Sequence, residues 1–140
     1  MPQSVTYLHL KPEAPLPEIL QSIPNRIVVV VDALVSQEWQ WIVSDWIIAS
    51  GCLYMMAWGL DCSSWDDSVD MAKLEKFDFN DIPEDCFVMT TWHPDESLEV
   101  VFWLAKNDSN HPTVVIRHTV LLHISVESRE LELLSAYAEA

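Results

Sequence analysis

The feature that most constrains this chain is the run Ile27–Val31, five consecutive β-branched residues reading IVVVV. β-Branched side chains favour strands, and a run without polar alternation is typical of a strand that is covered on both faces. Such strands belong to parallel sheets flanked by helices. The run therefore predicts a buried strand of an α/β domain, and Asp32 follows that strand directly.

A helix pattern follows this strand. Apolar residues recur at the spacing of one helix face, at Trp39, Ile42, Val43, Trp46 and Ile47. Ser36 is a suitable N-cap, and Gly51 is suited to the position just after the helix.

The same alternation continues to the end of the chain. Cys52–Ala57 and Phe87–Thr91 are short apolar runs, and Thr113–Ile116 and Thr119–Ile124 are further β-type segments. Ser63 or Ser64, Pro94, and Ser125 or Ser128 are candidate starts of the helices between and after them. The order β-α-β-α-β-α-β-α predicts a single three-layer α/β/α domain with a mostly parallel sheet of four or five strands, Rossmann-like or flavodoxin-like.

The first residues differ from the rest in composition. Residues 1–25 contain five prolines, which interrupt both helices and sheet ladders. We expect residues 1–25 to form a proline-rich N-terminal arm, in which Val5–Leu10 is a short edge strand, and residues 26–140 to form the α/β domain.

The chain is strongly acidic, with a formal net charge of −15 from 22 acidic and 7 basic residues. Such a charge repels phosphate backbones and argues against direct nucleic-acid binding. Twelve of the 22 acids fall between Asp61 and Glu99. They are typical of a solvated face or of a surface that steers a basic protein partner.

The absence of several sequence motifs limits which cellular compartment and which cofactors we expect. The three cysteines are odd in number and form no CxxC motif, and neither an export signal nor an apolar run long enough for a membrane span is present. These features predict a cytoplasmic protein with free thiols. With only Gly51 and Gly59, the chain contains no glycine-rich phosphate loop, and no zinc-ligand spacing occurs, so we expect neither cofactor nor metal.

Reactive side chains follow the predicted strands, where open α/β sheets form their sites. The candidate catalytic residues are Asp32, Asp61, Cys62, His93 and Glu96. A Cys–His–acid set needs a thiol within hydrogen-bond reach of an imidazole, and these residue types match no recognised local signature. His123, inside an apolar segment, is expected to be a hydrogen-bonded core histidine. The candidate ligand- or partner-binding residues are Trp58, Trp65, Asp66, Asp67 and Trp92.

The strings WGLDCSSWDDSVD and FVMTTWH, with IVVVVDALVS upstream, resemble a group of short bacterial proteins without an assigned function. The resemblance runs from about Arg26 to Tyr137. It implies a single bacterial domain and carries no activity, cofactor or catalytic residue.

Two functions remain open at this point. The leading interpretation is a protein-binding module with an immunity, antitoxin or defence-associated role, in which acids steer a basic partner and exposed tryptophans anchor it. The steering acids would be Asp66, Asp67, Asp70, Asp78, Asp81, Glu84 and Asp85. The alternative is a small-molecule or nucleotide-binding domain, or a hydrolase, with its pocket at the strand ends. A homodimer without activity of its own is a third interpretation.

Overall fold

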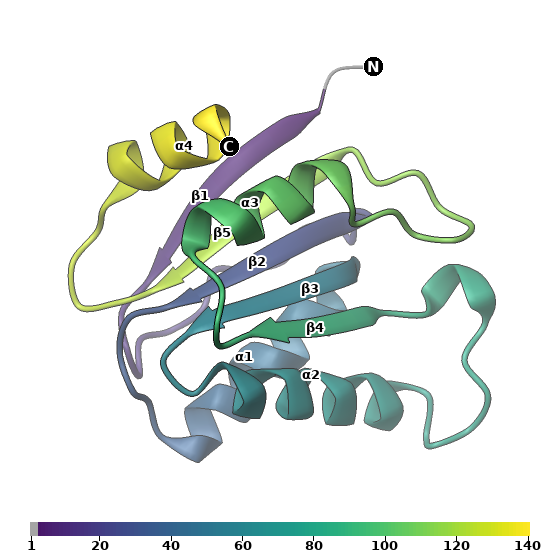
Figure 1. Ribbon diagram of the computed structural model, residues 1–140. Helices are drawn as coiled ribbons and strands as arrows, with labels where there is room; N and C mark the ends of the chain where they lie inside the picture. Colours follow the sequence, from purple (N-terminus) through teal and green to yellow (C-terminus); the bar gives the residue numbers. More distant parts are fainter. Residues whose placement is uncertain (1–2) are drawn as a thin grey trace.

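The computed structural model describes residues 3–140, which form one five-stranded sheet and four α-helices (Figure 1). All strand pairs are parallel, in the spatial order β1-β5-β2-β3-β4. The elements along the chain are β1 (Ser4–Leu10), β2 (Asn25–Val31), α1 (Gln37–Ala49), β3 (Cys52–Gly59), α2 (Cys62–Lys76), the 3-10 turn η1 (Glu84–Cys86), β4 (Met89–His93), α3 (Leu98–Asn107), β5 (His118–Ile124) and α4 (Glu130–Glu139).

The domain has three layers. Helices α1 and α2 cover one face of the sheet, and α3 and α4 cover the other (Figure 1). Alternate residues of the central strand belong to the two cores: Val29 shares one core with Trp65 of α2, and Val28 shares the other with Phe102 of α3. The predicted three-layer α/β/α domain with a mostly parallel sheet is confirmed.

Strand β2 is the middle strand, and all seven of its residues are buried. This confirms that the β-branched run is a strand covered on both faces. In the register, Val30 lies opposite Trp58 of β3 and opposite His123 of β5. Because every strand runs the same way, all five carboxyl ends lie at one edge of the sheet, which we call the carboxyl edge.

The direction of the chain reverses between two neighbouring strands. After β2 the chain enters α1 on one face, and after β5 it enters α4 on the other face. The carboxyl ends of β2 and β5 therefore form the topological switch point of the sheet, where ligands of open α/β proteins bind.

The first strand lies within the segment that was expected to form an arm. Residues 4–10 form β1, which pairs along its whole length with β5 at the edge of the sheet. The sheet thus takes in part of the proline-rich segment, whereas residues 11–24 contain no helix or strand. None of the helices in residues 3–140 combines the length and the apolar character that crossing a bilayer requires.

Helix boundaries are where the sequence-based expectations failed most often. Ser36 caps α1, and Gly51 follows α1 with a φ of +98°, both as predicted. However, α2 begins already at Cys62 after a left-handed Asp61, and Ser97 rather than Pro94 begins α3. Helix α4 has no side-chain cap, and residues 113–116 form no strand. Helix ends are the least sharply encoded part of a helix, and several residues near each start had suitable capping chemistry.

Candidate functional site

The switch point holds a hydrogen-bonded cluster that joins three strands and the last helix. Asp32, directly after β2, accepts hydrogen bonds through Oδ2 from Nε2 of His123 at 2.6 Å and from Nη2 of Arg129 at 2.5 Å. The hydroxyl of Tyr7 on β1 lies 2.6 Å from Nδ1 of the same imidazole. We call Tyr7, Asp32, His123 and Arg129 the switch-point cluster.

The hydrogen bonds fix the protonation of the imidazole. Because Asp32 accepts from Nε2, that nitrogen carries the proton, and Nδ1 accepts from the Tyr7 hydroxyl. Burial lowers the pKa of His123 and outweighs the opposing effect of its hydrogen bond to Asp32. Burial raises the pKa of Asp32, but the hydrogen bonds from His123 and Arg129 together bring it below its ordinary value. At neutral pH the pair is a carboxylate and a neutral imidazole.

The hydrogen bonds of the switch-point cluster link neighbouring strands of the sheet to one another. The His123 side chain is fully buried, and both of its ring nitrogens have partners. The oxygen of Tyr7 in turn accepts from the backbone N–H of Arg129 at 3.0 Å. An imidazole without exposed surface cannot contact a substrate, so the arrangement fastens β1, β2, β5 and the start of α4 to one another.

His93, at the end of β4, belongs to a separate group. Its Nδ1 donates to Glu96 at 2.7 Å, and its Nε2 lies 2.9 Å from the hydroxyl of Thr91. The indole of Trp58 donates to the backbone oxygen of Glu96 at 2.8 Å. Two predicted catalytic residues and one predicted binding residue are thus brought together, where they fix the loop after β4.

The remaining catalytic candidates do not join either group. Asp61 is exposed and precedes α2 with a φ of +51°, and it caps the helix with no side-chain hydrogen bond. Cys62 is buried in the core beneath α1 and α2. Among residues 3–140, no three side chains of the metal-ligating types are placed to hold an ion.

The predicted binding residues differ in accessibility. Trp92 is half exposed, whereas Trp65 is only 2% exposed and packs beneath α2. Asp66 is also buried, and the pKa of its carboxyl is raised by burial and by the neighbouring Asp70. The expectation that Trp65 and Asp66 lie on the surface is wrong, because both point from α2 toward the sheet.

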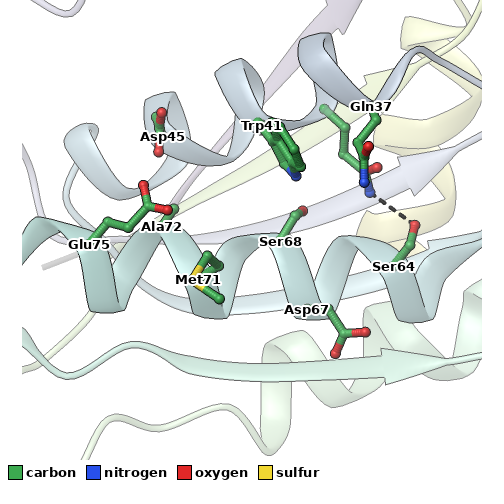
Figure 2. A pocket seen from close by; sticks show the side chains of 10 residues that line it. Gln37, Trp41, Asp45, Ser64, Asp67, Ser68, Met71, Ala72 and Glu75 are labelled. Atoms are coloured by element: carbon green, nitrogen blue, oxygen red, sulfur yellow. Dashed lines mark hydrogen bonds between the residues drawn. The ribbon is translucent and has the colours of Figure 1, made fainter. Parts of the chain in front are cut away.

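A groove of about 500 Å³ runs between the outer faces of α1 and α2 (Figure 2). Trp41 of α1 and Met71 of α2 are 52% and 47% exposed, and both line it. Its acidic residues are Asp45, Asp67 and Glu75, and no basic side chain lines it. We call it the α1/α2 groove.

Small residues at the helix contact create this groove. Ser44 and Ser68 face each other at 2.7 Å between their hydroxyl oxygens, and Ser68 and Ala72 line the groove. Larger residues that line it come from both helices, with Trp41 and Asp45 from α1 and Met71 and Glu75 from α2 in Figure 2. The hollow combines apolar surface with uncompensated negative charge.

Sequence reasoning missed most of these residues. Within the α1/α2 groove it singled out only Asp67. Within the switch-point cluster it singled out Asp32 and recognised His123 only as a hydrogen-bonded core residue. Available signals were the histidine in the apolar string VLLHI and Trp41, which lies off the apolar stripe of its helix.

Comparison with known proteins adds one relationship. A family model described as a domain of unknown function, DUF7684, matches residues 5–140. No curated protein and no solved structure matches the chain.

Proposed function

The chain belongs to the DUF7684 family, a domain of unknown function, and from that premise we propose that it is a protein-binding module whose α1/α2 groove binds a basic, amphipathic segment of a partner protein. The observation that carries this proposal is the groove itself. It pairs exposed apolar side chains with three acids and no basic residue.

The apolar part of the groove supplies the anchor. Trp41 on α1 and Met71 on α2 are large, exposed side chains that both line the groove (Figure 2). Tryptophan is enriched among the residues that dominate binding energy, and methionine adapts to irregular partner surfaces. One apolar face of a partner helix or extended segment would cover both side chains.

The acids of the groove would orient the partner protein and speed its association. Asp45, Asp67 and Glu75 line the groove, and the whole chain carries a formal net charge of −15. A field of one sign attracts a basic partner from a distance and disfavours acidic ones. A second copy of this chain would bring the same acids to the groove, so a basic segment of another protein is the better occupant.

The catalytic alternative receives less support from the geometry. His93 and His123 both have partners on both ring nitrogens, and Cys62 is buried away from either imidazole group. Side chains used in this way act as anchors of loops and strands. The acids, the small size and the occupied histidines together favour binding, with an immunity, antitoxin or defence-associated role in the cytoplasm.

The test compares two triple variants that change the net charge equally. D45N/D67N/E75Q neutralises the groove, and D78N/D81N/D85N neutralises exposed acids between α2 and β4. Each would be used in pull-downs against the products of neighbouring genes, followed by calorimetry on a captured partner. We expect the groove variant to weaken binding by about tenfold or more, and the loop variant mainly to slow association.

A third variant separates anchoring from charge. W41A leaves every acid in place and should weaken the same complex by about thirtyfold, as removal of an interface anchor does. Equal affinity of the wild type, W41A and the groove triple variant would exclude the α1/α2 groove as the binding surface.

A further inference from the structure

A second cavity, of about 700 Å³, lies at the opposite edge of the sheet from the switch point. Its walls come from the amino ends of β1 and β2, the carboxyl ends of α3 and α4, and the loop that joins α3 to β5 (Figure 1). Its larger apolar side chains are Val5, Val114, Val115, Ile116, Leu134 and Tyr137. We call it the amino-edge cavity.

Arg26, at the start of β2, contributes to the wall of this cavity and is only 7% exposed. Its Nη1 donates to the hydroxyl of Thr119 at 3.1 Å, and its Nη2 donates to the backbone oxygen of Ser109 at 3.0 Å. Its Nε is buried without any hydrogen-bond partner. Throughout residues 3–140 no carboxylate forms an ion pair with it.

A buried guanidinium without a carboxylate is unfavourable, because neutral oxygens replace its lost hydration only in part. Burial accordingly lowers the pKa of Arg26. The chain has 22 acidic residues that could have served as the counter-charge, yet none of them lines this cavity. The site is thus the reverse of the α1/α2 groove, with positive charge and no acid.

The other basic side chain of the wall is already occupied. Nζ of Lys106 donates to the backbone oxygens of Tyr137, Ala138 and Ala140 at 3.1, 3.2 and 2.8 Å, which uses its three N–H groups. Lys106 adds positive potential but has no donor left for a ligand. Of these two cationic side chains, Arg26 is therefore the one with unused donors.

We propose that the amino-edge cavity binds a small organic monocarboxylate with an apolar body, whose carboxylate pairs with Arg26. The apolar body would lie along Val114, Ile116 and Leu134, and the volume is within the range of small-molecule sites. The carboxylate supplies the counter-charge that the protein lacks, and guanidinium groups match carboxylates in geometry.

The experiment uses decanoate as the probe, with decan-1-ol and decylamine as ligands of equal chain length but different head charge. Calorimetry on the full chain should give binding of decanoate about tenfold or more tighter than decanol, and no binding of decylamine. Amide chemical shifts measured by NMR should change at residues 114–116 and around Leu134. Equal affinity for decanoate and decanol, or no binding of decanoate, would overturn the proposal.

Variants assign the effect to the charge. R26M should abolish the preference for decanoate over decanol while leaving decanol binding unchanged. Because R26M also removes two internal hydrogen bonds, V115D provides a second test at a side chain that is 69% exposed, where an added acid should repel decanoate by about tenfold. V126D, at a residue of similar exposure after β5, is the matched control and should bind decanoate like the wild type. Unchanged decanoate affinity in V115D would contradict the site.

Discussion

Asp32 and His123 belong to neighbouring strand ends, 91 residues apart in the chain, and share a hydrogen bond of 2.6 Å. The imidazole is fully buried and neutral, and the carboxylate also accepts from Arg129. One carboxylate thereby satisfies the polar group inside β5 and holds the start of the last helix. This pairing makes stability depend on pH in a defined direction.

His123 should make the protein less stable in mild acid. Burial holds its pKa below the ordinary value of 6.5, so the unfolded chain takes up a proton more readily than the folded protein. The free energy of unfolding should therefore fall as the pH drops from 7 through 6.5 and toward the folded pKa. Urea unfolding of H123Q over the same range should show a shallower dependence. Parallel curves for the two proteins would contradict this assignment.

Asp32 should contribute stability that is lost in stronger acid. Its folded pKa lies below the ordinary value of 3.8, so its contribution is present above that value and disappears as the pH falls through the folded pKa. At pH 7, D32N should cost about 2 kcal/mol, because Nε2 of buried His123 and the guanidinium of Arg129 lose a charged acceptor. Glu127 is an exposed acid near the same edge that forms no ion pair within residues 3–140, and E127Q should change the free energy of unfolding by less than about 0.5 kcal/mol.

Replacing two tryptophans by alanine should have very different effects on the free energy of unfolding. Trp65 is buried in the core, and W65A should lower the free energy of unfolding by about 3–5 kcal/mol through lost packing and a cavity. W41A removes a side chain that is half exposed and should cost less than about 1 kcal/mol. Chemical unfolding of both variants checks this contrast. A severe loss in W41A would mean that Trp41 is a structural residue rather than a free anchor.

Asp66 should lower stability near neutral pH. Burial and the nearby Asp70 raise its pKa, and its Oδ1 is buried without a hydrogen-bond partner. A raised folded pKa favours folding in acid and loses that advantage as the pH rises through it. D66N should therefore increase the free energy of unfolding at pH 7 by about 1 kcal/mol. D67N, exposed on the next position of α2, should have little effect on stability.

Gly59 should tolerate no side chain. Its φ is +102°, and a Cβ there would lie 2.2 Å from the backbone oxygen of Val31. G59A should therefore push apart the carboxyl ends of β2 and β3 and cost about 2–4 kcal/mol. Thermal unfolding of G59A beside A138G, at the exposed end of α4, gives the comparison. A loss as small as that of A138G would show that the two strand ends can separate freely.

Much of the architecture could be predicted because short stretches of sequence indicate strands and helices by their own residue pattern. The β-branched residues of β2 and the apolar stripe of α1 identified those elements, and the alternation predicted a parallel sheet. Helix starts were less certain, since serines and prolines near α2, α3 and α4 offered competing caps. In α3 the cap is Ser97, whose hydroxyl accepts from the backbone N–H of Val100, whereas α2 and α4 begin without any side-chain cap.

The candidate sites depended on pairings that no local pattern encodes. Tyr7 and His123 are 116 residues apart, and they meet because β1 pairs with β5. That strand order is a property of the whole fold. Likewise the α1/α2 groove exists only because α1 and α2 lie side by side. That Arg26 is a cation without a carboxylate partner could be recognised only once its neighbours in space were known.

The place of β1 at the far side of β5 has a consequence for synthesis. Ser4 pairs with His118, and the order of strands gives β1 no other neighbour. Strand β1 therefore leaves the ribosome well before its partner and has no neighbouring strand until β5 has been made. Strands β2, β3 and β4 can pair with one another during translation, whereas β1 can join the sheet only once β5 is present.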